Sequence, residues 1–175
     1  SLPCQETFVT KPISPYGESK LMIEQIMKSY RVAYGLDFVA LRYFNACGAD
    51  PQARHGQEPK ATHIIARVLE SIRDNSDFLI YGNDYETEDG TCVRDYVHVS
   101  DIADAHILAL DTKLIPADTY NLGTATGASN LDIVNAATAV THQHIDVDFG
   151  PRREGDPAIL TADPGKFQKL TNWKP

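Results

Sequence analysis

A nearly unbroken apolar run, residues 38–44, constrains the fold of this chain more than any other feature. It reads Phe-Val-Ala-Leu-Arg-Tyr-Phe and has the length of one strand. The run lacks the polar alternation of a strand with one face in water, and it is typical of a strand covered on both faces. Such a strand needs helices on both sides, so we expect an α/β fold.

A helix pattern lies directly before this strand. Ser14 is a good N-cap, Pro15 suits the first helical position and Gly35 provides a stop. The sequence therefore predicts a helix over residues 15–34. Its apolar side chains are expected to face inward; they are Leu21, Ile23, Ile26, Met27 and Tyr30.

The rest of the chain continues to alternate between helix and strand patterns. Helices are predicted near 61–74, 100–111 and 130–140, with Ser100 and Ser129 as caps, and Asp163-Pro164 opens a short last helix. Strands are predicted near 78–81, 93–99, 119–122 and 145–149. Residues 46–60 and 82–92 have the composition of loops.

Composition excludes several classes of partner. The 175 residues carry a net charge of −8, which argues against a broad surface for nucleic acid or anionic membrane. The cysteines are widely spaced, as in a reducing compartment, and offer no metal framework. No apolar run approaches membrane-spanning length. We therefore expect a cytoplasmic protein that binds no nucleic acid, membrane or metal.

Residues 14–20, Ser-Pro-Tyr-Gly-Glu-Ser-Lys, place a phenol and an ammonium four positions apart. Positions i and i+4 share a helix face, so Tyr16 and Lys20 can point into one cleft. A nearby fixed cation favours the phenolate, which makes the pair a candidate proton-transfer device. The same spacing is common in helices with a half-buried Tyr and a solvated Lys, so the pattern alone leaves both interpretations open.

Three further clusters offer groups suited to a phosphorylated ligand. Asn45 follows the buried strand, where ligands of α/β sheets gather. Arg94 begins a strand, and its planar guanidinium can bind a phosphate with two hydrogen bonds. Arg153 and Asp156 share a charged turn. Taken singly, the clusters fit a turn Asn, a surface ion pair of Arg94 with a nearby Asp, or a solvated turn at least as well.

Read together and in order, these segments resemble the UDP-glucose 4-epimerases of the extended short-chain dehydrogenase/reductase family. The third stretch quoted below is the most specific one, because it points to 4-epimerases over related dehydratases, decarboxylases and reductases. The resemblance implies NAD as cofactor, a UDP-sugar as substrate and a homodimer for the full-length protein. The matching stretches are SPYGESKLMIEQI, ALRYFNACGA, GNDYETEDGTCVRDYVHVSDIADAH, YNLGTATGASNLDIV and GPRREGDPAILTAD.

The resemblance also implies roles at the reacting centre. Tyr16 would take the proton from the sugar 4-hydroxyl, and Lys20 would hold the nicotinamide ribose and favour the phenolate. Tyr43 and Phe44 would lie beside the nicotinamide. Hydride transfer to NAD would give a 4-keto sugar, which turns over in the pocket and takes the hydride back on its other face.

Further residues would hold the UDP-sugar by the same resemblance. Leu79 and Tyr81 would flank the uracil, and Asp156 would bind the uridine ribose. Arg94 and Arg153 would bind the diphosphate. Contacts near the sugar would come from Asn45, from His63, where the family often has Asn, and from Leu160, which would limit room around C2.

The chain departs from the family in one respect. No Gly-rich dinucleotide turn occurs in it, and no strand precedes the first helix. We therefore expect a C-terminal portion of such an enzyme, inactive alone, with residues 1–46 as the remnant of the NAD-binding Rossmann domain and 47–175 as the UDP-sugar-binding domain. The alternatives are an epimerase of UDP-N-acetylhexosamine or UDP-glucuronate, and a non-catalytic sugar-nucleotide-binding module.

Overall fold

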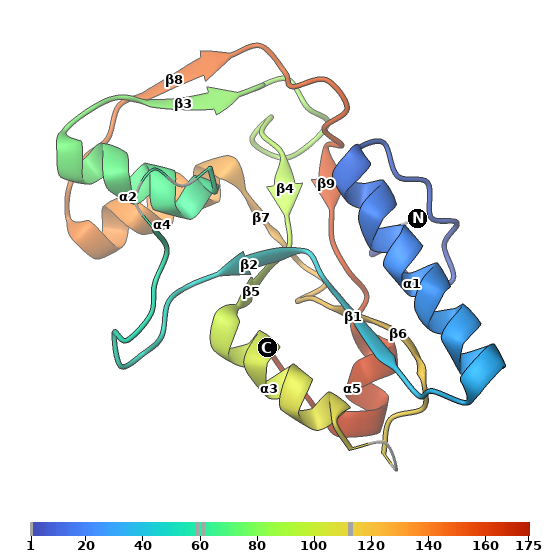
Figure 1. The fold of residues 1–175 in the computed structure, drawn as a ribbon. Helices are drawn as coiled ribbons and strands as arrows, with labels where there is room; N and C mark the ends of the chain where they lie inside the picture. The colour runs from blue at the N-terminus through green and yellow to red at the C-terminus, as the bar shows by residue number, and fades with distance from the viewer. Residues whose placement is uncertain (1, 59, 61, 112–113) are drawn as a thin grey trace.

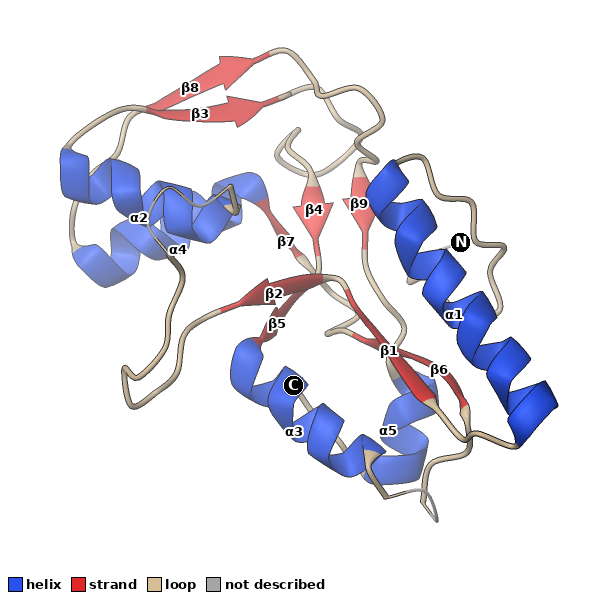
Figure 2. Cartoon of the chain, viewed as in Figure 1, coloured by secondary structure: helices blue, strands red, loops and turns tan. Residues whose placement is uncertain are grey.

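The structure, a computed structural model, describes residues 2–58, 60, 62–111 and 114–175, and its helices and strands alternate along the chain (Figures 1 and 2). The expected α/β fold is confirmed. The helices are α1 (Pro15–Tyr34), α2 (Ile64–Asp74), α3 (Val99–Ala109), α4 (Asn130–Thr141) and α5 (Gly165–Thr171). The strands are β1 (Val39–Tyr43), β2 (Asn45–Cys47), β3 (Phe78–Tyr81), β4 (Val93–Arg94), β5 (Tyr96–His98), β6 (Asp118–Leu122), β7 (Ala128–Ser129), β8 (Val147–Gly150) and β9 (Ile159–Leu160).

Helix α1 begins and ends where the sequence predicts. The Ser14 hydroxyl accepts a hydrogen bond from the Gly17 N–H at 3.1 Å, and Pro15 is the first helical residue. Gly35 has the left-handed φ of 69° that favours glycine and donates its N–H to the Arg31 carbonyl. Both ends of the helix are therefore fixed by local sequence.

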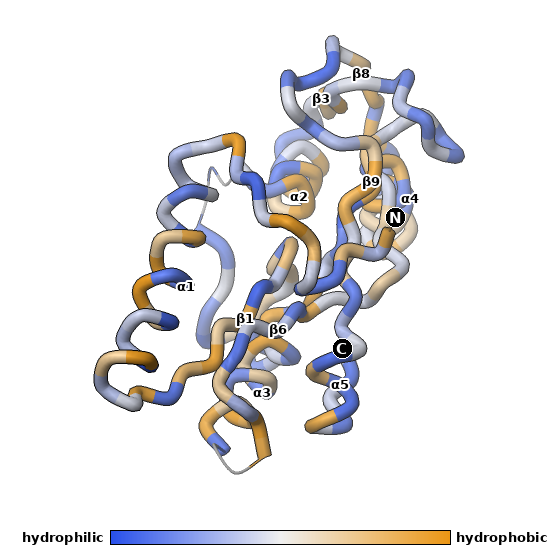
Figure 3. The backbone as a smooth tube through the Cα atoms, turned by 90° about the vertical axis from the view of Figure 1, so that its right-hand side faces the viewer, coloured by the Kyte–Doolittle hydropathy of each residue, from blue (hydrophilic) through white to orange (hydrophobic). Residues whose placement is uncertain are grey.

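The inward face expected for α1 is wrong for Ile23, Ile26 and Tyr30, which are each about half exposed. The buried side chain of this helix is Glu24, which accepts hydrogen bonds of 2.6 Å from two guanidinium nitrogens of Arg42 in β1. Helix α1 is thus joined to the sheet by a two-point ion pair, and apolar residues lie along its outer side (Figure 3). We call Met22, Ile23, Ile26 and Tyr30 the apolar stripe of α1.

The first core lies around the parallel β1–β6 ladder, in which Leu41 is opposite Tyr120. Helices α3 and α5 lie on one side of this ladder and α1 on the other (Figure 1). Strand β1 is only partly covered, with Ala40 as its buried residue, because the α1 side is sparsely packed. The buried members of this core are Val97, Ile102, Ala105, Ile115, Tyr120, Leu122, Phe167 and Trp173.

A second core lies between the α2–α4 helix pair and the parallel β3–β8 pair, which run side by side at the top of Figure 1. Its buried members are Val68, Ile72, Phe78, Ile80, Val134 and Ile145. The three-stranded sheet β7-β4-β9 lies between the two cores. The expected domain division at residues 46 and 47 stays a prediction; the β1–β6 and β2–β5 ladders both join residues from its two sides.

Three predicted boundaries differ from the structure. The strand expected over 93–99 is divided into β4 and β5 at Asp95, which is fully buried. The cap of α3 is His98 and not Ser100, because the His98 ring nitrogen Nδ1 accepts the Ser100 N–H at 3.2 Å. Helix α2 begins at Ile64, and the expected start near Ala61 lies outside the described residues. The predicted Ser129 cap of α4 is confirmed as a capping box.

Of the helices in the described residues, none combines the length and apolarity needed to cross a lipid bilayer.

Candidate functional site

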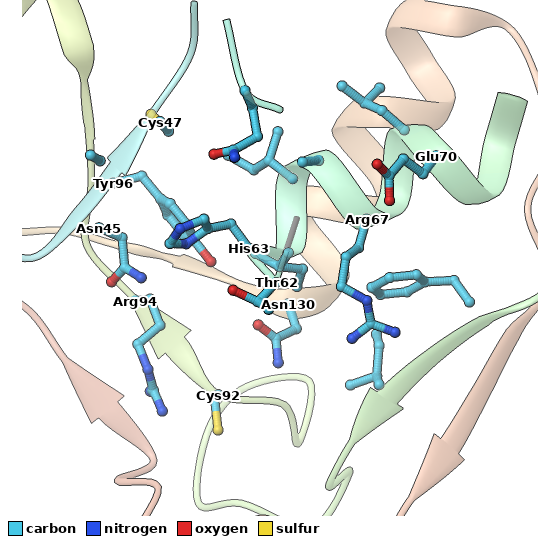
Figure 4. Close-up of a pocket in the computed structure, with 18 of the residues that line it drawn as sticks. Asn45, Cys47, Thr62, His63, Arg67, Glu70, Cys92, Arg94, Tyr96 and Asn130 are labelled. Atoms are coloured by element: carbon cyan, nitrogen blue, oxygen red, sulfur yellow. The ribbon is translucent and has the colours of Figure 1, made fainter. Parts of the chain in front are cut away.

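A cavity of about 740 Å³ lies where β2, β4, α2 and β3 face one another, a size typical of ligand sites. Side chains from segments far apart in the chain point into it (Figure 4). The structure therefore brings together most of the residues predicted to hold a nucleotide sugar. Those that line the cavity are Asn45, His63, Leu79, Tyr81, Arg94, Arg153 and Asp156.

The two predicted phosphate-binding arginines are held in different ways. Arg94 has a side chain that is 14% exposed and donates to the carbonyls of Val93 and Pro157 at 2.9 and 2.8 Å. Its ion partner is Asp156 at 3.5 Å, so the interpretation as a surface pair with Asp89 or Asp95 is wrong. The Arg153 guanidinium lies 4.3 Å from the centre of the Tyr81 ring.

Asp95 is the buried residue that orients this part of the site. Its carboxylate accepts hydrogen bonds from the Thr124 N–H and hydroxyl, the Ala125 N–H and the Ala162 N–H, at 2.7–3.2 Å. Because side chains alternate along extended backbone, the inward Asp95 places Arg94 and Tyr96 on the opposite, cavity side. The carboxylate thus positions two site residues without lining the cavity itself.

The remaining predicted cavity residues lie at the ends of elements. Asn45 begins β2, and its N–H donates to the Asp95 carbonyl at 3.0 Å. His63 precedes α2, and its imidazole makes no capping hydrogen bond to that helix, so it stays available to a ligand. Leu79 and Tyr81 are two residues apart on β3 and share one face, as flanking a flat base requires.

Sequence reasoning missed Arg67, Tyr96 and Asn130, which also line the cavity. Tyr96 could have been found from its two-residue spacing to Arg94. Burial raises the pKa of Tyr96 to about 12, so at neutral pH it is a hydrogen-bond donor and not a base. Arg67 lies four residues after His63, on the same face of α2.

Tyr16 and Lys20 lie apart from this cavity among the described residues. Tyr16 is 73% exposed, and the Lys20 ammonium is 5.1 Å from the centre of its ring. The expected side-by-side placement of the two groups is therefore present, on an open surface of α1. The shared cleft expected for them stays a prediction.

Tyr43, Phe44 and Leu160 also lie outside the residues that line the cavity in the described part of the chain. Tyr43 ends β1, is 47% exposed and lies 6.2 Å from the His106 ring, centre to centre, while Phe44 follows it directly. Leu160 is paired with Arg94 across the β4–β9 ladder. It is therefore next to the cavity wall.

The chain is similar in sequence and in structure to known UDP-glucose 4-epimerases. The UDP-glucose 4-epimerase of Lacticaseibacillus casei is 50% identical over 180 residues, covering 99% of this chain and 54% of that protein. The Brucella ovis UDP-glucose 4-epimerase in complex with NAD has a TM-score of 0.93 and 41% identity, covering 99% of this chain and 55% of that one. The Bifidobacterium longum enzyme in complex with NAD⁺ and UDP has a TM-score of 0.87 and 37% identity, covering 99% and 54%.

The chain spans about half the length of the curated relatives it matches. Its residues 2–123 match the model of the NAD dependent epimerase/dehydratase family. That match covers more than half of the chain and includes Tyr16, Lys20, Asn45 and Arg94. The chain belongs to the NAD dependent epimerase/dehydratase family.

Proposed function

We propose that the protein at its natural full length epimerises a UDP-hexose, UDP-glucose or UDP-galactose, at C4 with NAD as cofactor. The observation that carries this proposal is the cavity in which Asn45, Arg94, Arg153 and Asp156 converge from distant segments. Guanidinium groups match a diphosphate, and a carboxylate accepts from ribose hydroxyls. The relatives and neighbours named UDP-glucose 4-epimerase support the same choice of sugar nucleotide.

The residues of this chain fit the nicotinamide end of NAD. The ammonium of Lys20 and the phenol of Tyr16 suit ribose hydroxyls, and the exposed ring of Tyr43 suits the flat nicotinamide. No Gly-rich pyrophosphate turn occurs in the sequence. We therefore assign Tyr16, Lys20, Tyr43 and Phe44 to the nicotinamide end. When bound, NAD supplies a hydride acceptor that also returns the hydride.

In the proposed mechanism, Tyr16 accepts and donates the proton. Its phenolate oxygen takes the proton of the sugar 4-hydroxyl as C4 is oxidised, and the phenol returns a proton when C4 is reduced. The ammonium of Lys20 lies 5.1 Å from the centre of the same ring, and we assign to it the contact with the nicotinamide ribose that the resemblance implies. Arg94 and Arg153 hold the diphosphate throughout, so the 4-keto sugar stays tethered while it presents its other face.

A UDP-N-acetylhexosamine is a second candidate substrate. Leu160, paired with Arg94 in the ladder, is a side chain of medium size at the position that would limit room around C2. The neighbours also include a UDP-Glc/GlcNAc 4-epimerase from Campylobacter jejuni, with a TM-score of 0.79 and 38% identity. Assays of both substrate types with the full-length protein separate these two candidates.

We also propose a homodimer for the protein at its natural full length. The apolar stripe of α1 is a surface that would gain stability by being covered. Sedimentation of the full-length protein measures this directly.

The test of function is a Tyr16→Phe variant of the full-length protein. Removing the hydroxyl should lower kcat by at least about a hundredfold, the range of general-base catalysis, with UDP binding unchanged. Tyr34→Phe is the matched control, because it removes the hydroxyl of an exposed tyrosine on the same helix, outside the apolar stripe. UDP binding without any epimerase activity in the unaltered protein would favour a non-catalytic module instead.

A further inference from the structure

Residues 151–157, which follow β8, form an exposed turn that carries Arg153 into the cavity wall. We call this segment the 151–157 turn. Every one of its residues is exposed, so burial does little to hold it. At its far end, Arg94 pairs with the Asp156 carboxylate at 3.5 Å and donates to the Pro157 carbonyl at 2.8 Å. The end that carries Arg153 needs a different attachment.

Arg152 supplies that attachment. Its Nε donates to the Asp84 carboxylate at 2.6 Å, and a terminal guanidinium nitrogen donates to the Asp84 backbone carbonyl. Its guanidinium also lies 4.3 Å from the centre of the Tyr85 ring. Arg152 thus ties the turn after β8 to the loop after β3, the two segments that continue from a pair of parallel strands (Figure 1).

The loop after β3 leaves room for the stem of Arg152. Gly82 has a left-handed φ of 83°, and a Cβ at this position would lie 2.9 Å from the Arg152 Cγ and collide with the Tyr85 ring. The missing side chain of Gly82 therefore lets both groups pack against the backbone. The Gly82 N–H also donates to the Gly150 carbonyl at 2.9 Å, which joins the two loops where they leave the strands.

The two neighbouring arginines are used differently. The guanidinium of Arg153 lies 4.3 Å from the centre of the Tyr81 ring and belongs to the cavity wall. Among the described residues that line the cavity, Arg152 is absent, and its charge is paired with Asp84. A contact between an exposed cation and a ring is weak, so the direction of Arg153 depends on where the backbone beside it is held.

We propose that Arg152 is a positioning residue, which fixes the 151–157 turn so that the Arg153 guanidinium faces the diphosphate of the UDP-sugar. The inference rests on the proposed function, because that function assigns Arg153 to the diphosphate. The diphosphate does not react, so its contacts are the same before and during the chemical step. Loss of Arg152 should therefore raise KM and leave kcat nearly unchanged.

The experiment measures UDP binding by calorimetry, and KM and kcat for UDP-galactose, in the full-length protein and its variants. Arg152→Leu should weaken UDP binding and raise KM by about fivefold, which one exposed ion pair and one cation–ring contact together supply. The value of kcat should change by less than about twofold. Arg152→Lys keeps a charge for Asp84 and should recover part of the loss. Arg54→Leu breaks a similar exposed pair, with Asp50, away from the cavity and should change none of the three quantities.

Two further variants distinguish positioning from attraction by charge. Asp84→Ala removes the partner of Arg152 and also a negative charge, so attraction of the anionic ligand by charge alone predicts tighter UDP binding. Positioning predicts the opposite sign, a loss of about two- to fivefold. In a double-mutant cycle, Arg152→Leu should cost less than about twofold once Arg153→Leu is present, because the side chain that it positions is gone.

Three results would overturn the inference. Tighter UDP binding in Asp84→Ala would show that Arg152 acts through its charge. Losses that add in the cycle of Arg152 and Arg153 would show that the two arginines act independently. Unchanged UDP affinity in Arg152→Leu would show that the 151–157 turn is held without it. Absence of UDP binding in the unaltered protein would overturn the proposed function first, before any variant is compared. Should Arg152→Leu fail to fold in thermal melting, Asp84→Ala decides, because it keeps Arg152 and must still weaken UDP binding.

Discussion

The nucleotide-sugar cavity and the outer face of α1 carry different parts of the same proposed chemistry, and they differ in how they are held. At the cavity, Arg94 has a side chain that is 14% exposed and three partners, which are Val93, Asp156 and Pro157. At α1, Tyr16 is 73% exposed, and its partner is the Lys20 ammonium on the same helix. The groups that we propose for substrate binding are fixed by tertiary structure, whereas those that we propose for proton transfer are fixed by one helix.

This difference shows which part of the structure is held by contacts within the chain. Long-range hydrogen bonds and ion pairs between its own segments build the cavity. The apolar stripe of α1 has no such cover among the described residues, although a buried large apolar side chain contributes about 1.5–3 kcal/mol. We therefore expect substitutions around the cavity to change stability and binding most, and substitutions on the α1 face to change association.

The largest effect should come from Asp95→Ala. It leaves the buried N–H of Ala162 and the part-buried N–H groups of Thr124 and Ala125 without their acceptor, and the loss of an acceptor costs about 1–3 kcal/mol for a buried donor. The free energy of unfolding should fall by at least about 3 kcal/mol in urea titration. Asp148→Ala, an exposed acid on β8, is the control and should change it by less than about 0.5 kcal/mol. A small effect at Asp95 would remove the distinction between the two regions.

Arg94→Ala should weaken UDP binding by about 1.5–3 kcal/mol, the range for hydrogen bonds to charged groups. Calorimetry with the full-length protein measures this change. Arg31→Ala, on the α1 side, removes an arginine whose ion pair with Asp37 is exposed and should leave UDP affinity unchanged. Equal losses at both positions would mean that long-range charge, and not the cavity, holds the nucleotide.

Glu24→Gln tests the attachment of α1 to the sheet. The hydrogen bond to Glu24 raises the pKa of Arg42 although burial opposes it, so the guanidinium stays charged and loses its counterion. We expect a loss of about 1.5 kcal/mol in unfolding free energy, measured by urea titration. Asp74→Asn breaks the exposed pair with Arg73 and should cost less than about 0.5 kcal/mol. Equal losses of unfolding free energy in the two variants would mean that the Glu24–Arg42 pair holds α1 no more firmly than an exposed ion pair would.

The smallest effect on folding, and a measurable one on association, should come from Ile26→Lys in the 175-residue chain. A charge in the apolar stripe of α1 should reduce self-association in sedimentation velocity, while unfolding free energy changes by less than about 0.5 kcal/mol. Val140→Lys places the same charge at an exposed valine on α4 and should leave association unchanged. A monomeric unaltered chain would contradict the role of the stripe.

Local signals could be predicted from sequence, and contacts between distant segments could not. Ser14, Pro15 and Gly35 fix α1 because a cap acts within one turn, and the same holds for Ser129 of α4. The sequence could not show that His98 and not Ser100 caps α3, because both are suitable acceptors. It also missed the burial of Asp95, since partners at positions 124–125 and 162 are brought to it only by the fold.

The site shows the same limit. The resemblance identified Arg94, Arg153 and Asp156, and the cavity brings them together, but their roles stay predictions, of which Arg94→Ala tests one. Ile23 and Ile26 were expected to face inward because helical period identifies an apolar side without showing what covers it. Arg67 gave no sequence signal, because an arginine on an amphipathic helix is ordinary until its neighbours are known.

Because of the position of Asp95, we expect the thermal stability of the protein and its retention of a bound ligand to be connected. The carboxylate does not line the cavity, yet the backbone on either side of it carries Arg94 and Tyr96 into the cavity. A change that loosens the turn at 124–125 or the segment at Ala162, two residues after β9, should free those two side chains at the same time. Warming should therefore release the sugar nucleotide before the molecule unfolds, and bound nucleotide should raise the melting temperature by holding this junction shut.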